Sequence, residues 1–201
     1  RERDALSTTK DVFKDIMAQA NYQGRKRAPG PTKMSVAALR HMYRERAETL
    51  AIDAAEKMNA RVVKALNQIK KSGKKLTQTG VREVIDKYVN AYTGTVLRTV
   101  INDENEKGFM AQMSHPDVMK NNPGLRFVTM RDDRVRHNHS PAEGFVARTS
   151  DPVWEELRPP LGFNCRCRLE PVSSEEIKSL RIGHREAPPA GAHRDDGFLA
   201  S

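Results

Sequence analysis

The sequence predicts an α+β protein: long N-terminal α-helices that form an antiparallel hairpin, followed by a small α+β domain with short strands and loops. Three observations support this fold class. Apolar residues recur at helical spacing through most of the chain up to Met113. After Ser114-His115-Pro116, turn-forming residues and short alternating segments replace that pattern. Aromatic residues make up only 5% of the chain and charged residues 30%, which suits elongated helices better than a large globular core.

The N-terminal region, residues 1–33, is predicted to be one helix followed by a basic linker. Apolar residues such as Phe13 and Met17 place the helix at about residues 4–20. Gly24, the basic run after it and an Ala-Pro-Gly-Pro sequence then predict that residues 21–33 form a flexible connection.

Residues 34–113 are predicted to form the helical hairpin. Its first helix is expected to start at the N-cap Ser35 and to stop at Ser72-Gly73. Thr77 is expected to cap the second helix, which ends near Met113. Because the intervening turn is short, two helices of this length should lie antiparallel.

Residues 114–182 are assigned to the small α+β domain. Asn121-Asn122-Pro123-Gly124 predicts a turn, and the alternating residues 125–130 predict a short strand. Ser173, with Glu176 three residues later, predicts the start of a short helix. Residues 183–201 are rich in Ala, Pro, Gly, His, Arg and Asp and are expected to form an extended C-terminal tail.

The chain carries a formal net charge of +9, which favours an acidic partner: nucleic acid or an acidic protein surface. A solvated helical surface explains the same charge. The candidate phosphate-contacting residues are Arg25, Lys26, Arg27, Lys70, Lys71, Lys74 and Lys75. Because no helix-turn-helix, zinc-finger or ribonucleoprotein signature accompanies them, any contact with DNA is expected to be non-specific.

The sequence offers no apolar run near the roughly 20 residues that a membrane span needs, and no signal peptide is recognised. Its two cysteines, Cys165 and Cys167, are separated by one residue and are poorly placed for a mutual disulfide. We therefore expect a reducing compartment, with thiols that are free, linked between subunits or bound to metal.

Metal-capable residues are concentrated between Thr129 and Cys167. The two thiols can bind one Zn(II), His139 or His137 can supply a nitrogen, and Asp132 or Asp133 an oxygen. A closed set of four such ligands would be a structural zinc site in a domain with a small apolar core.

Two other interpretations of this stretch remain open. In one, the thiols are small buried residues under Trp154 and Phe163, and His139 makes hydrogen bonds in a turn. In the other, Asp132, His139 and the Cys pair form a metal-dependent hydrolase or nuclease. Against catalysis, an Asp pair between basic residues is more often a turn with surface ion pairs, and no oxyanion-type turn follows Cys165.

The same stretch resembles the Mu F-like phage head morphogenesis family, the minor head or minor capsid proteins associated with the portal. The positions that carry the resemblance are Asp132, Val135-Arg136, His139, Gly144, Asp151-Pro152-Val153-Trp154 and Pro159-Pro160-Leu161-Gly162-Phe163-Asn164-Cys165-Arg166-Cys167. Arg98-Thr99, Asn105 and Gly108 resemble the preceding helix, and Asp196-Gly197-Phe198 a terminal segment, so the resemblance covers about residues 80–201. It favours His139 over His137 as the ligand.

The resemblance implies a non-enzymatic protein of the virion head or procapsid, present in the host cytoplasm during assembly. Its implied partners are the portal protein and other head proteins, in an oligomeric context, with packaged DNA nearby. Within the motif the expected structural residues are Arg136, Gly144, Trp154, Pro160 and Gly162. The expected metal ligands are Cys165, Cys167, His139 and Asp132.

Overall fold

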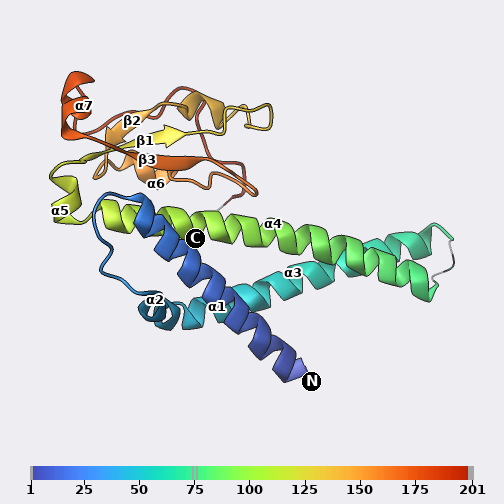
Figure 1. Ribbon diagram of the computed structural model, residues 1–201. Helices are drawn as coiled ribbons and strands as arrows, with labels where there is room; N and C mark the ends of the chain where they lie inside the picture. Colours follow the sequence, from blue (N-terminus) through green and yellow to red (C-terminus); the bar gives the residue numbers. More distant parts are fainter. Residues whose placement is uncertain (1, 74, 76, 199–201) are drawn as a thin grey trace.

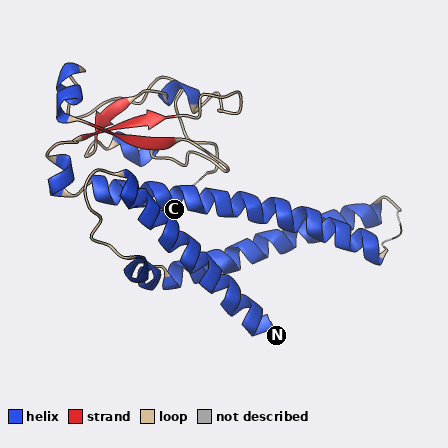
Figure 2. Cartoon of the chain, in the orientation of Figure 1, coloured by secondary structure: helices blue, strands red, loops and turns tan. Residues whose placement is uncertain are grey.

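The computed structural model describes residues 2–73, 75 and 77–198, with side chains from residue 10 onward (Figure 1). Long helices form one part of the molecule and a small α+β domain the other, which confirms the predicted fold class (Figure 2). The helical part consists of α1 (Glu2–Arg27), α2 (Val36–Met42), α3 (Arg44–Lys71) and α4 (Gln78–Met113). The small domain consists of α5 (Pro116–Met119), β1 (Gly124–Val128), the 3-10 helix Ser140–Ala142, β2 (Val146–Arg148), α6 (Val153–Leu157), β3 (Arg168–Val172) and α7 (Ser174–Ser179).

The helix α1 is longer than predicted. It continues through Arg27, so the prediction of a linker from residue 21 is wrong for residues 21–27. Gly24 does not end the helix; it lies where α1 crosses α4. A Cβ at Gly24 would lie 1.8 Å from the Asn105 carbonyl oxygen, and a Cβ at Gly108 2.0 Å from the Asn21 carbonyl oxygen. The two glycines therefore let the backbones approach more closely than side chains would allow.

The first helix of the hairpin is interrupted once. A continuous helix was expected from Ser35 to about Lys71, but the chain bends at Tyr43, between α2 and α3. Tyr43 is buried in the helical core and its hydroxyl donates a hydrogen bond to the Glu104 carboxylate on α4. The helix is thus interrupted at a residue that bonds to a distant helix, and no Gly, Pro or capping residue in the local sequence predicts the interruption.

The predicted helix ends are confirmed. The Ser35 hydroxyl accepts a hydrogen bond from the Ala38 amide at 3.2 Å, and the Thr77 hydroxyl one from the Gly80 amide at 3.1 Å. The helix α3 stops at Ser72, and Gly73 adopts a φ of +75°. These caps depend only on neighbouring residues, which is why the sequence reveals them.

The helices α3 and α4 lie side by side and antiparallel, and their connecting turn is the far tip of the molecule (Figure 1). The helix α1 packs across both of them at the end nearer the small domain. The helical core is formed by apolar side chains of α1, α2 and α3 together with Tyr43, namely Phe13, Met17, Ala18, Leu39, Tyr43, Ala47 and Ala51. Part of the hairpin thus extends beyond α1 as a two-helix arm.

The small domain is built on a three-stranded antiparallel sheet in the order β2-β1-β3. On the central strand, Leu125 pairs with Ala147 of β2 and Pro171 of β3. The last turns of α4 contribute Phe109 and Met113 to the core of this domain. One helix therefore belongs to both parts of the molecule. None of the helices in the described ranges is long and apolar enough to cross a membrane.

Residues 183–198, the described part of the expected tail, form no helix or strand, but they fold back onto the small domain. The Asp195 amide donates to the Leu161 carbonyl at 2.8 Å, and Phe198 is buried. The Arg194 guanidinium donates to the Glu155 carbonyl at 2.9 Å. The tail is thus a packed segment rather than a free extension.

Candidate metal centre

His139, Cys165 and Cys167, here called the metal centre, lie buried between two loops of the small domain. His139 ends the loop that follows β1 and directly precedes the 3-10 helix. The two cysteines lie in the loop that leads into β3. The exposed fractions are 2% for His139, 5% for Cys165 and 4% for Cys167. The three side chains are therefore held inside the domain.

The ligand atoms of the metal centre are close enough to share one ion. The histidine nitrogen and the two sulfurs all lie within 4.8 Å of one another, and His139 Nδ1 is 3.8 Å from Cys165 Sγ. Tetrahedral zinc, with Zn–S near 2.3 Å and Zn–N near 2.0 Å, separates its ligand atoms by roughly 3.5–3.8 Å. The three residues also line a hollow of about 20 Å³, enough for one small occupant.

Asp132, the fourth predicted ligand, does not lie with the other three ligand residues. Its two carboxylate oxygens each accept a hydrogen bond from the Arg166 guanidinium at 2.7 Å, and one also accepts from the Arg134 amide. The Arg166 contact lowers the pKa of Asp132. His137 and Asp133, the alternative ligands, are not buried. The structure thus gathers three of the four predicted ligands.

The two thiols influence each other's ionisation. A hydrogen bond from the Cys167 thiol, with a further contribution from His139, lowers the pKa of Cys165. The same contact with Cys165, together with burial, raises the pKa of Cys167. The two shifts have opposite directions, so Cys165 is the thiol that loses its proton more readily. A metal ion bound between the sulfurs would replace the thiol protons.

The second ring nitrogen of His139 has a partner that sequence reasoning missed. Nε2 lies 3.1 Å from the Asp195 carboxylate, which comes from the C-terminal tail. Asp195 is 56 residues away in the chain. The nearby Asp196-Gly197-Phe198 segment resembles a terminal segment of the family, but that resemblance does not predict a contact with the metal centre.

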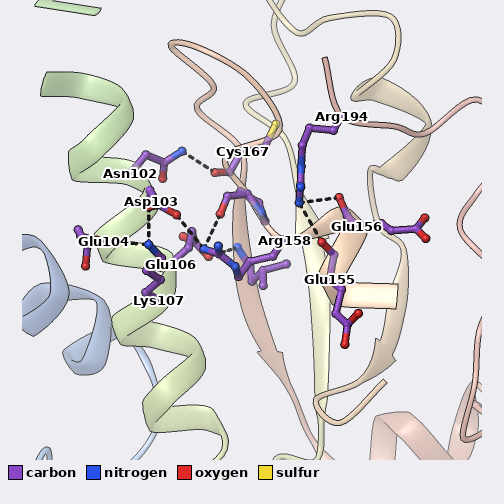
Figure 3. A network of polar contacts seen from close by, with 12 residues as sticks. Asn102, Asp103, Glu104, Glu106, Lys107, Glu155, Glu156, Arg158, Cys167 and Arg194 are labelled. Atoms are coloured by element: carbon purple, nitrogen blue, oxygen red, sulfur yellow. Dashed lines mark hydrogen bonds and ion pairs between the residues drawn. The ribbon is translucent and has the colours of Figure 1, made fainter. Parts of the chain in front are cut away.

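The helix α4 holds the cysteine loop in place. The Asn102 side chain donates to the backbone carbonyl of Cys165 at 2.8 Å. It also approaches the carbonyl of Cys167, at 3.4 Å (Figure 3). Thr99 Oγ1 accepts from the Asn164 amide at 3.1 Å, and Arg98 donates to the Asn164 side chain at 2.8 Å. These contacts place the thiols relative to the helical part.

Three of the predicted structural residues surround the metal centre. Arg136 donates to the Phe163 carbonyl at 2.6 Å and so joins the two loops. Pro160 follows a cis peptide bond in the segment before the cysteines. At Gly162 an added Cβ would lie 1.8 Å from an Asp195 carboxylate oxygen, so only glycine leaves room for the tail.

The other two structural residues shape the rest of the domain. Gly144 has a φ of +76° and its amide donates to the Phe127 carbonyl at 2.9 Å. Trp154 is buried, and its indole N–H donates to the Arg148 carbonyl at 2.8 Å. Its ring also packs against Phe145, with centroids 5.8 Å apart.

The predicted phosphate-contacting residues fall into two groups. Lys70, Lys71 and Lys75 are all exposed at the tip of the hairpin. Lys74 lies outside the described residues. Near the end of α1, Lys26 lies over the Tyr22 ring, 5.9 Å from its centroid.

Arg25 and Arg27 are engaged within the protein. Arg25 donates to the Asn21 side chain at 3.0 Å. Arg27 donates to the buried Glu106 carboxylate and, at 2.6 Å, to the Leu169 carbonyl of β3. The expectation that Arg27 is available to phosphate is therefore corrected: its guanidinium joins α1, α4 and the sheet.

A buried polar network connects α4 to the small domain (Figure 3). Glu106 accepts from the Leu169 amide at 3.0 Å as well as from Arg27, and burial raises its pKa. Asp103 pairs with Arg158 at 3.1 Å and with Lys107 at 2.7 Å. The sequence alone predicts that these charged residues lie on a solvated helix face. It does not reveal their burial, because the residues that pair with them are distant in the chain.

The chain matches a known protein family over part of its length. The sequence profile described as Phage Mu protein F like protein matches residues 67–170, just over half of the chain. The matched part runs from the end of α3 through α4 and into β3, so it contains the whole metal centre. It ends before Asp196-Gly197-Phe198, where resemblance to the family had been expected.

Three curated proteins are similar over short stretches. The Mu-like prophage FluMu F protein of Haemophilus influenzae is 34% identical over 86 residues, which are 42% of this chain and 20% of that protein. Protein F of Escherichia phage Mu, named for capsid assembly, is 34% identical over 60 residues, 30% of this chain and 14% of its own length. An uncharacterised protein of Methanocaldococcus jannaschii is 41% identical over 51 residues, 25% of this chain and 8% of its own length.

The matched stretches thus cover at most a fifth of the length of these relatives. No solved structure matches the chain.

Proposed function

Because the chain belongs to the phage Mu protein F-like family, we propose that it is a structural protein of phage head morphogenesis. The observation that carries this proposal is the family match over residues 67–170. The similarity to a phage Mu protein named for capsid assembly supports it. On this proposal the protein works in the host cytoplasm during assembly and stays in the procapsid or virion head, in an oligomeric context.

We further propose that the arm formed by α3 and α4 docks the protein on the portal and other head proteins. Support comes from the shape of the molecule, in which the arm projects away from the sheet (Figure 1). Along the arm, Val63 is 56% and Ile85 39% exposed, so apolar surface is available to a partner. Burying such side chains would contribute favourably to association.

Co-purification with the portal protein tests this proposal. Val63→Glu and Ile85→Glu together should lower retention on immobilised portal at least tenfold, because a charge replaces apolar contact. Leu180→Glu is the matched control, since Leu180 is 49% exposed at the end of α7 and far from the arm. Equal retention of both variants, or no retention of the wild-type chain, would contradict arm docking.

The proposed cofactor is one structural Zn(II) ion at the metal centre. The donor set supports it, because a histidine nitrogen and two thiolates within 4.8 Å are ligands that zinc prefers. His139, Cys165 and Cys167 would fill three of the ion's four positions, and the ion would cross-link the loop after β1 to the loop before β3. Stapling of this kind stabilises a domain that has a small core.

A non-enzymatic role fits the site better than the alternative, a metal-dependent hydrolase or nuclease. The Asp132 carboxylate, which that alternative needs on the metal or on water, is paired with Arg166. The thiols and His139 are also buried. An Asp132→Asn variant that folds normally but loses a nuclease activity of the wild type would support the enzyme instead.

We also propose non-specific contact with packaged DNA through the lysines at the hairpin tip. Lys70, Lys71 and Lys75 all reach solvent there, and each can neutralise a phosphate without reading a base. Arg27 does not take part in this proposal, because the buried network holds its guanidinium.

A further inference from the structure

We propose that Asp195 of the C-terminal tail is a positioning residue of the metal centre: its carboxylate orients His139 as a ligand and so couples the tail to metal binding. The inference rests on the metal proposed above and goes beyond it. Asp195 lies outside the stretch that matches the family, and sequence reasoning did not select it.

The geometry around the His139 ring carries the inference. Nε2 lies 3.1 Å from Asp195 Oδ1, and an ionised carboxylate can only accept a hydrogen bond. The ring proton therefore belongs on Nε2, which leaves the lone pair of Nδ1 free. Nδ1 is the atom that lies 3.8 Å from Cys165 Sγ. Histidine ligands of metals usually donate their other N–H to a carboxylate or carbonyl in this way, which fixes the tautomer and the ring plane.

Asp195 is itself held by both loops of the site. Its amide donates to the Leu161 carbonyl at 2.8 Å, and its carboxylate accepts from Asn138 at 3.1 Å. The Arg136 guanidinium lies 3.3 Å from the second carboxylate oxygen. Gly162 leaves the space that this oxygen occupies, since a Cβ there would lie 1.8 Å from it. The carboxylate thus has a defined place against the histidine.

The tail residues next to Asp195 are anchored as well. The His193 amide donates to the Asn138 carbonyl at 3.1 Å, and Arg194 donates to the Glu155 carbonyl at 2.9 Å. Phe198 packs edge-on against Phe163, with ring centroids 5.2 Å apart. Because the same segment docks on the domain and orients a ligand, docking and metal binding should strengthen each other reciprocally.

Metal affinity of the full chain tests the inference. Zn(II) binding is measured by competition with a chromophoric chelator, and Co(II) absorption reports the ligand set. We expect Asp195→Asn to weaken Zn(II) binding about 10- to 100-fold, with one ion per chain retained. Asp196→Asn is the matched control: it removes the same charge from the adjacent, exposed residue and should leave the affinity unchanged.

The outcomes separate the two proposals. A wild-type chain that binds no Zn(II) overturns the metal centre itself. A wild-type chain that binds Zn(II), together with an Asp195→Asn variant that binds it equally tightly, overturns only the role of Asp195.

The tautomer of His139 provides a measurement that general loss of stability would not change. Long-range proton–nitrogen correlation on the metal-free wild-type chain should show the proton on Nε2. In the Zn(II)-loaded chain the Nδ1 resonance should move to the position of a metal-bound nitrogen. A proton on Nδ1 in the metal-free wild type would overturn the inference, even if Asp195→Asn weakened metal binding.

Discussion

Gly24 and Gly108 determine how closely α1 and α4 cross. At each position a backbone carbonyl of the opposite helix lies so close that an added Cβ atom would overlap with it. The close crossing aligns Arg27 with Glu106, and so places the buried network between the helices and the sheet. The two glycines thus allow the ion pair between Arg27 and Glu106 to form.

We expect Gly108→Ala to lower the free energy of unfolding by about 1–3 kcal/mol or more, because the new methyl group would force the helices apart. Gly94→Ala is the control on the same helix. Its Cβ would meet only the flexible end of the Arg98 side chain, at 3.2 Å, so alanine's helix propensity should stabilise by up to about 1 kcal/mol. Urea unfolding followed by circular dichroism measures both, and equal effects would contradict the close crossing.

The sequence predicts individual residues well where the interaction is local. Ser35 and Thr77 cap their helices through amides three residues away, so their roles follow from the adjacent sequence. From the local sequence Gly24 predicts the end of a helix, because its close contact with α4 depends on residues that are distant in the chain. Asp195 was missed for the same reason.

At the scale of elements, the hairpin of α3 and α4 presents its basic turn farthest from the sheet (Figure 1). Lys70 and Lys71 end α3, and Lys75 lies in the turn. Long lysine side chains at such a tip can follow a phosphate backbone without a fixed geometry. Binding of this kind depends on salt and little on base sequence.

Replacing Lys70, Lys71 and Lys75 by Glu should weaken binding to duplex DNA at low salt, uniformly across sequences. The slope of log K against log salt should fall by about 0.9 for each phosphate that the variant no longer neutralises. The control replaces three basic residues on the surface of the small domain by Glu, namely Lys120, Lys178 and Arg185. Fluorescence anisotropy over a salt series measures the slope, and the same decrease in both triple variants would exclude a role specific to the tip.

The elements themselves were largely predictable, because apolar periodicity over long segments marks α3 and α4 clearly. The break at Tyr43 was not, since its hydroxyl bonds to Glu104 on a different helix. The strand predicted at residues 125–130 is present as Gly124–Val128, where its pairing with β2 and β3 sets its ends. Tertiary contacts, rather than propensity, account for these differences.

At the scale of the whole molecule, α4 and the tail connect the parts. The helix α4 contributes to the helical arm, the domain core and the placement of the cysteine loop. The tail returns from the far end of the sequence to the metal centre. Removing the proposed ion should therefore loosen more than the two loops that bind it.

We expect chelation of the Zn(II)-loaded chain to speed tryptic cleavage after Arg181, Arg185 and Arg194, because docking of the tail and metal binding strengthen each other, so the tail leaves the domain more often without the ion. Mass spectrometry of timed digests measures the rates. The Cys165→Ser/Cys167→Ser double variant should be cleaved quickly with or without chelator. A loaded wild-type chain whose tail is cleaved at one rate in both conditions would contradict this coupling.

The continuous helix α4 has a mechanical consequence. It runs unbroken for 36 residues, so it is a rod about 54 Å long. One end of the helix lies at the hairpin tip. Toward the other end, Asn102 donates a hydrogen bond to the cysteine loop, and Phe109 and Met113 pack in the core of the small domain. We therefore expect a sideways force on the tip to reach the loop that carries the thiols through this helix. The glycine crossing with α1 is the contact about which the helix would turn.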